Sequence, residues 1–74
     1  MTYGIYTVHD KVIGAYMAPF IMVNEDAAKR EFSIMCKRKP EIAEDLSLWK
    51  LGTYEDEKGT VIGVVPEMVR FGKE

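Results

Sequence analysis

One helix-forming segment separates two stretches that favour β-strands, and this order restricts the folds that the chain can adopt. Asn24 is a good N-cap, because its side chain can accept a hydrogen bond from an exposed amide of the first turn. Pro40 cannot continue a helix, so the segment is expected to end near Arg38. The apolar residues that recur within it at helical spacing are Ala27, Ala28, Phe32, Met35 and Cys36. This stripe predicts one amphipathic helix that packs against a core.

The residues before the helix predict a β-hairpin. Residues 3–8 and 12–22 are rich in aromatic and β-branched types, which strands favour. The turn is expected at the intervening residues His9, Asp10 and Lys11. Pro19 cannot donate a hydrogen bond to a neighbouring strand, so we expect it at a sheet edge or at the end of the pairing.

The residues after the helix predict an acidic connector followed by a second hairpin. The connector, residues 41–45, is long enough for one helical turn. Strands are expected over residues 47–54 and 60–65. Gly59 lies in the turn between them and is expected to supply a positive φ.

These elements predict an α+β fold of β-hairpin, helix and β-hairpin, in which one helix packs on a four-stranded antiparallel sheet. The 74 residues are expected to form a single domain, because they are too few for a second core. Pro66 is expected to end the last strand. Residues 67–74 would then form a tail that either packs on the domain or extends to a partner.

One helix covers only one face of such a sheet, so the other face is expected to be polar, to bind a ligand, or to pair with a second copy. Strand alternation leaves open whether residues 3, 5 and 7 or residues 4, 6 and 8 face inward. The aromatic candidates for the uncovered face are Tyr3, Tyr6, Tyr16, Trp49 and Tyr54.

Few internal supports are available to a domain of this size. With one cysteine, Cys36, and one histidine, His9, the chain can form neither an internal disulfide nor a structural zinc site. Self-association is the remaining common support, and an apolar share of 47% is compatible with a homodimer. The sequence contains no basic segment followed by a long apolar run, so neither secretion nor membrane insertion is expected. No cofactor and no metal are expected.

No combination of residues predicts catalysis, so the chain is expected not to be an enzyme. His9 and Asp10 are adjacent and would point to opposite faces of a strand. Cys36 lies toward the carboxyl end of the predicted helix, where the helix dipole opposes a thiolate. The acidic residues do not follow EF-hand spacing, and the glycines form no phosphate-binding loop.

Positive charge is concentrated on the predicted helix, at Lys29, Arg30, Lys37, Arg38 and Lys39. The net charge is -2, so the molecule as a whole does not attract nucleic acid. The basic residues are either a solvated helix face that complements the helix dipole or contacts to phosphate groups. In the second case, aromatic residues such as Tyr16 and Trp49 would stack on unpaired bases.

Four segments of the chain, taken in order, resemble the small non-structural protein of gokushoviruses, the single-stranded DNA phages of the Microviridae. The segments are residues 6–11, 16–20, 24–32 and 44–56, the last followed by Gly59. The most specific parts are a Tyr-x-x-Pro-Phe element that begins at Tyr16 and a Leu-x-x-x-Gly-x-Tyr-acidic element that begins at Leu48. His9 departs from the Tyr-Asp turn that is usual in the family, so no role of that turn is carried over.

The resemblance implies an accessory protein, described as DNA-binding or as acting in single-strand synthesis, in the host bacterial cytoplasm. It transfers no catalytic motif. Two hypotheses follow. The chain either binds single-stranded DNA during genome replication or packaging, or it is a protein-interaction module, a homodimer that engages the phage replication initiator or the procapsid without contacting DNA.

Overall fold

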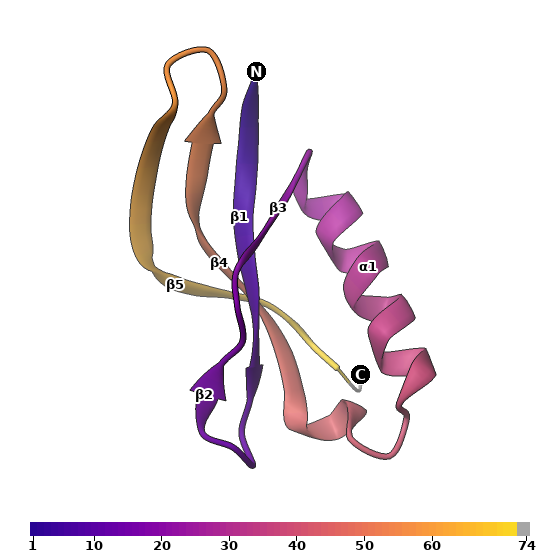
Figure 1. Cartoon of the computed structure of the whole chain (residues 1–74). Helices are drawn as coiled ribbons and strands as arrows, with labels where there is room; N and C mark the ends of the chain where they lie inside the picture. The colour runs from indigo at the N-terminus through magenta and orange to yellow at the C-terminus, as the bar shows by residue number, and fades with distance from the viewer. Residues whose placement is uncertain (73–74) are drawn as a thin grey trace.

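The computed structural model describes residues 1–72, which form one antiparallel sheet with one α-helix packed beside it (Figure 1). The elements are β1 (Thr2–Asp10), β2 (Ala15–Tyr16), β3 (Phe20–Met22), α1 (Glu25–Arg38), the 3₁₀ turn η1 (Ala43–Asp45), β4 (Leu46–Glu55) and β5 (Thr60–Phe71). The sheet order is β2-β1-β4-β5, and β3 also pairs with β1. The predicted α+β class and its antiparallel sheet are confirmed.

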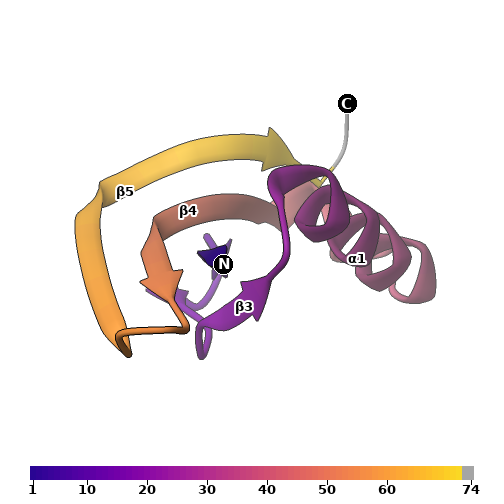
Figure 2. The ribbon, with the colours of Figure 1, turned by 90° about the horizontal axis from the view of Figure 1, so that it is seen from above.

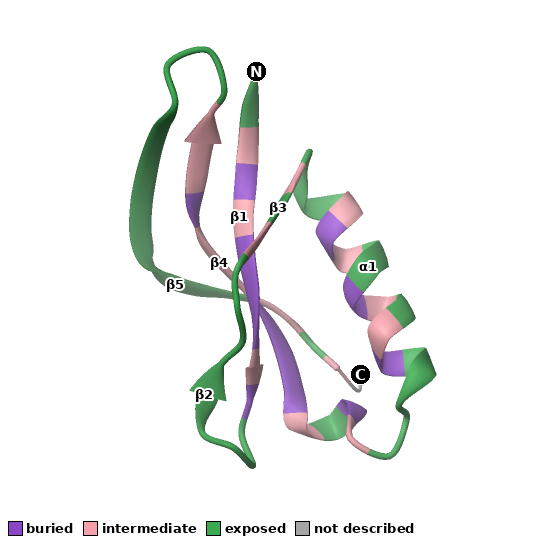
Figure 3. Cartoon of the chain, viewed as in Figure 1, coloured by how far each residue is buried: buried purple, intermediate pink, exposed green. Residues whose placement is uncertain are grey.

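The core lies between α1 and the face of the sheet that carries alternate residues of β1 and β4. Val8 of β1 is paired with Leu48 of β4, and both are buried with Phe32 of α1. The complete buried cluster comprises Tyr6, Val8, Ala28, Phe32, Cys36, Ala43, Leu46 and Leu48 (Figure 3). Residues 4, 6 and 8 therefore face the helix, and residues 3, 5 and 7 lie on the opposite face.

The helix begins and ends where the sequence predicts. The Asn24 side chain accepts a hydrogen bond of 2.8 Å from the Ala27 amide. At the other end, the amide of Lys39 donates to the Met35 carbonyl, and Pro40 follows. No helix within residues 1–72 has the length and apolar character needed to cross a membrane.

The first hairpin turns later in the sequence than expected. β1 continues through Asp10, and Val12, which was predicted to lie in the second strand, is at an exposed turn. The turn forms here because an Asp10 carboxylate oxygen accepts a 2.9 Å hydrogen bond from the Val12 amide. Gly14 then supplies a positive φ of 76°. Pro19 lies between β2 and β3, outside the paired residues, as predicted.

The expected end of the last strand at Pro66 is wrong. β5 continues to Phe71, and its register with β4 shifts so that residues 64–66 lie opposite Leu51 alone. Pro66 is tolerated because it lies in this irregular stretch of an edge strand, where its missing N–H breaks no regular pairing. The predicted tail is therefore strand over residues 67–71, and residues 73–74 lie outside the described part of the chain. Figure 2 shows how β4 and β5 curve around β1.

We expect substitution of Gly52, in the curved part of β4, to destabilise the fold. A Cβ atom at Gly52 would collide with the carbonyl oxygen of Ile62 on β5, so Gly52→Ala should lower the free energy of unfolding by about 1–3 kcal/mol. Gly63, its partner in the register, has open space where a Cβ would lie and provides the control, Gly63→Ala. Urea unfolding measures both variants. Equal midpoints for the two would show that the strands do not approach closely at Gly52.

The start of β1 is tied to the end of β4 through Glu55. The pKa of Glu55 is lowered from 4.5 to about 2, because its carboxylate accepts hydrogen bonds from the Glu57 amide, the Met1 ammonium group and the Thr2 hydroxyl. Between pH 4.5 and about 2, the unfolded chain therefore binds more protons at Glu55 than the folded chain does. The stabilisation of the fold by these contacts of Glu55 is complete above pH 4.5 and is lost as the pH falls toward 2.

The melting temperature of the wild-type chain is consequently expected to fall more steeply below pH 4.5 than that of Glu55→Gln. Scanning calorimetry across this range measures the difference. Glu57→Gln is the matched control, because only the backbone amide of Glu57 takes part in the contact. A Glu55→Gln profile as steep as that of Glu57→Gln would contradict the assignment.

Candidate nucleic-acid interface

The predicted basic residues all lie on α1 or at its C-cap, but they differ in how freely their charges are available. Lys29 is half-buried, and its Nζ atom is 3.5 Å from a carboxylate oxygen of Glu25. Arg30 is exposed in the first half of the helix. The last three, Lys37, Arg38 and Lys39, are exposed and form no ion pair with another residue between 1 and 72. Most of the available positive charge on the helix is therefore at its carboxyl end.

Lys29, Ser33 and Lys37 are spaced four residues apart and share one side of the helix, which is only partly exposed. Ser33 is half-buried, and its hydroxyl lies 3.4 Å from an Nη atom of Arg70, which donates to it from β5. β5 reaches the helix at this point because it continues beyond Pro66. The Ser33 side of the helix thus contacts the sheet. Because Ser33 lies between Lys29 and Lys37, these two lysines do not form one continuous binding surface.

The two predicted stacking residues, Tyr16 and Trp49, do lie together. Their ring centroids are 5.9 Å apart with nearly perpendicular planes, and Tyr16 also contacts the ring of His9 at 4.6 Å. The indole N–H of Trp49 donates to the Ser47 hydroxyl at 2.8 Å. His9 and Trp49 alternate with the buried residues Val8 and Leu48, so this aromatic cluster is on the sheet face opposite α1.

The predicted interface is consequently divided by the sheet. The basic residues are on the helix side, and Tyr16 and Trp49 are on the other side. Tyr3 and Tyr54, whose ring centroids are 6.4 Å apart, share the face with Tyr16 and Trp49, whereas Tyr6 is in the core.

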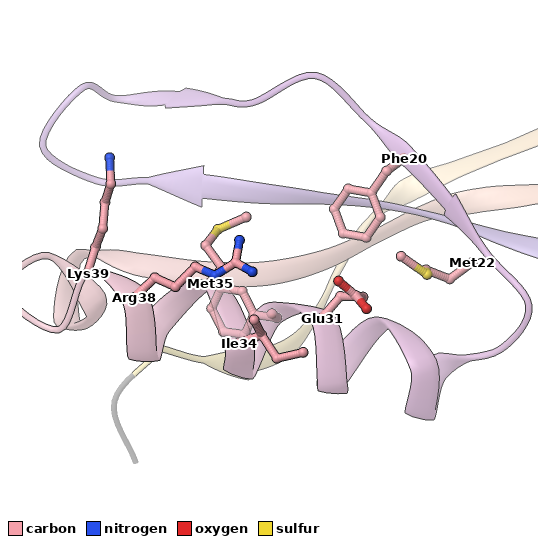
Figure 4. A pocket seen from close by; sticks show the side chains of 8 residues that line it. Phe20, Met22, Glu31, Ile34, Met35, Arg38 and Lys39 are labelled. Carbon is pink, nitrogen blue, oxygen red and sulfur yellow. The ribbon is translucent and has the colours of Figure 1, made fainter.

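A different aromatic residue, Phe20, lines the same groove as two of these basic residues. A groove of about 570 Å³ runs between β3 and α1 and has an apolar floor with charged residues at its rim (Figure 4). Its lining residues are Phe20, Met22, Glu31, Phe32, Ile34, Met35, Arg38 and Lys39. Arg38 and Lys39 lie toward one end of the groove, and Glu31 lies with Met22 toward the other. The groove thus combines an aromatic ring, flexible thioethers and two cations.

Sequence reasoning did not assign Phe20 to a site, although it belongs to the Tyr-x-x-Pro-Phe element. The available signal was its position directly after Pro19, which ends the β2 pairing and starts a new strand at Phe20. That short strand lies on the edge of β1 nearest the helix, as Figure 1 shows. The contact between Phe20 and α1 depends on this arrangement and cannot be read from spacing alone.

The groups considered for catalysis have structural roles. The Asp10 carboxylate binds turn amides, and the ring of His9 packs against Tyr16. Burial raises the pKa of the Cys36 thiol. Among residues 1–72, no group of three or more His, Cys, Asp or Glu side chains is arranged to hold a metal ion.

A family model described as Phage ORF5 protein matches residues 3–74, which include the helix, the groove and the described strands except for the first residue of β1. No curated protein and no solved structure matches the chain.

We expect Cys36 to react slowly while the chain is folded. Its thiol is buried and its pKa is raised by that burial, so both access and thiolate population are reduced. Alkylation by iodoacetamide at mildly alkaline pH, followed by mass spectrometry, should be at least about tenfold slower in buffer than in concentrated urea. Equal rates in the two conditions would show that this part of the core is open.

Proposed function

Because the chain belongs to the Phage ORF5 protein family, we propose that it is a non-enzymatic phage accessory protein that binds single-stranded DNA. We place it in a gokushovirus, in the host bacterial cytoplasm, acting during genome replication or packaging. The observation that carries the proposal is the groove between β3 and α1, which is lined by the ring of Phe20 and by two cations, Arg38 and Lys39.

The acidic turn at residues 55–57 accounts for three of the twelve carboxylate side chains, and it lies far from this groove. The acidic turn at residues 55–57 and the carboxyl end of α1 lie at opposite ends of a molecule that is 41 Å long (Figure 1). Charges on the surface are screened within about 8 Å at physiological ionic strength. A phosphate bound near Arg38 is therefore influenced by the adjacent cations much more than by the distant acidic turn.

In the proposed binding mode, a base stacks on Phe20 while the flanking phosphates contact Arg38 and Lys39, and Lys37 adds positive charge from the adjoining side of the helix. The groove favours single strands, because only unpaired bases can leave the stack and enter a pocket beside a helix. Glu31 repels phosphate from the other end of the groove, which directs the backbone toward Arg38 and Lys39. In this proposal Phe20 stacks on the base, in place of Tyr16 and Trp49, which the sequence suggested.

Removing the charges at the groove should weaken binding to every sequence and reduce its dependence on salt. Each phosphate contact contributes about 0.7 to the slope of log affinity against log salt for single strands, so Arg38→Gln combined with Lys39→Gln should lower the slope by about 1.4. The single variant Lys39→Gln has a matched control in Lys58→Gln, which also removes one positive charge but from the distant turn. The control should leave both the affinity and the salt slope unchanged. Fluorescence anisotropy of a labelled oligothymidine, titrated at several salt concentrations, measures both effects.

The aromatic residue that stacks can be identified in the same assay. Phe20→Leu keeps an apolar side chain but removes the ring, and loss of one stacked base costs about 1–3 kcal/mol of binding energy. Tyr16→Leu makes the same kind of change on the opposite face and should leave affinity unchanged. A larger loss with Tyr16→Leu than with Phe20→Leu would move the strand to the open face. Absence of binding by the wild-type chain at low salt would refute DNA binding altogether.

A second candidate function is favoured by the sheet face opposite α1. This face carries Tyr3, Tyr16, Trp49 and Tyr54, and the surface that they form suits a protein partner better than a polyanion. The chain would then be an interaction module that engages the phage replication initiator or the procapsid. Lack of DNA affinity, together with retention of such a partner in a pull-down that Trp49→Ala abolishes, would favour this candidate.

A further inference from the structure

The outer strand β5 leaves one edge of the sheet unpaired within the described part of the chain. In the sheet order β5 has only β4 beside it, and residues 60–68 are all exposed (Figure 3). Val61, Ile62 and Val65 expose 63%, 60% and 84% of their surfaces. Successive side chains point to opposite faces, so aliphatic groups are exposed on both sides of this strand. Such an edge readily accepts another strand.

We propose that β5 pairs in antiparallel fashion with β5 of a second copy of this chain, about a two-fold axis at Gly63. The run from Thr60 to Pro66 contains no charged residue, and Gly63 is its midpoint. A two-fold axis there overlaps the two runs completely and places Val61 opposite the partner's Val65. The proposal does not depend on DNA binding.

The composition of the strand favours a second copy over a charged partner. A two-fold interface brings the same surface from both copies together, so a charged strand would meet its own charge, whereas an aliphatic strand meets aliphatic groups. The proposed register also brings Lys58 near the partner's Glu67 at each end of the pairing. Opposite charges then flank an uncharged centre.

The bend of the strand limits the pairing. Residues 64–66 form the irregular stretch opposite Leu51, and Pro66 has no N–H to donate. The ladder therefore ends near Pro66, and the contact is smaller than the roughly 800 Å² per partner of a standard interface. We expect a dissociation constant in the micromolar range and not a permanent dimer.

A single engineered cysteine tests the register directly. Residues opposite each other in an antiparallel pair have Cα atoms about 4.5–5.5 Å apart, within the range that a disulfide spans. A Cβ at Gly63 meets nothing within the chain, so Gly63→Cys should fold normally and form a disulfide with its counterpart under mild oxidation. In Val61→Cys the two thiols are offset by four residues, about 13 Å along the strand, and should link far more slowly.

Non-reducing electrophoresis measures the rate of disulfide-linked dimer formation by the two variants. The wild-type chain is the blank, because it measures any cross-linking through the buried Cys36. Faster dimer formation by Gly63→Cys than by Val61→Cys supports the proposed pairing. Equal rates, or none above the wild-type blank, overturn it. Circular dichroism establishes that both variants are folded.

Sedimentation measures the association without a cross-link. Val65→Lys places a charge on the proposed interface and should raise the dissociation constant at least tenfold. Val12→Lys is the matched control, because Val12 is 74% exposed at the turn after β1, away from β5. A wild-type chain that stays monomeric at the highest soluble concentration overturns the proposal. So does equal association of Val65→Lys and Val12→Lys.

Discussion

The burial of Phe32 between α1 and the sheet positions the other features of this molecule. Phe32 is almost completely buried together with Tyr6 and Leu48, which lie on the neighbouring strands β1 and β4. Full burial of such a side chain contributes about 1.5–3 kcal/mol, a large share of the stability of a chain this short. Fixing this face of α1 against the sheet also fixes the direction of Arg38 and Lys39, which lie on the rim of the groove beside β3.

The helix could be predicted from sequence because its signals are local. Asn24 caps the first turn through its own side chain, and Pro40 stops the helix for steric reasons that do not depend on the rest of the fold. The turn after Asp10 and the passage of β5 through Pro66 were predicted wrongly. Both depend on hydrogen bonds and a register shift that exist only once the strands have paired.

In the candidate interface, too, the features with local signals could be predicted from sequence and those that depend on strand pairing could not. The basic residues could be identified from sequence, because charge near a helix end needs no tertiary information. Their aromatic neighbour could not, since Tyr16 and Phe20 are only four residues apart yet contribute to opposite sides of the sheet. The intervening Pro19 interrupts the strand, and the residues on its two sides contact different surfaces.

The distribution of charge makes the proposed DNA contact and the proposed dimer compatible. A basic cluster next to the two-fold axis would oppose association, but Lys37, Arg38 and Lys39 lie at the far end of the molecule from the turn that precedes β5 (Figure 1). The turn itself carries the carboxylates of Glu55 and Asp56, and the Met1 ammonium group contacts both, at 3.0 and 2.7 Å. This cation offsets part of the negative charge that two copies would otherwise bring toward each other. The strongest cationic surface and the uncharged strand edge are therefore separated, and occupying one does not obstruct the other.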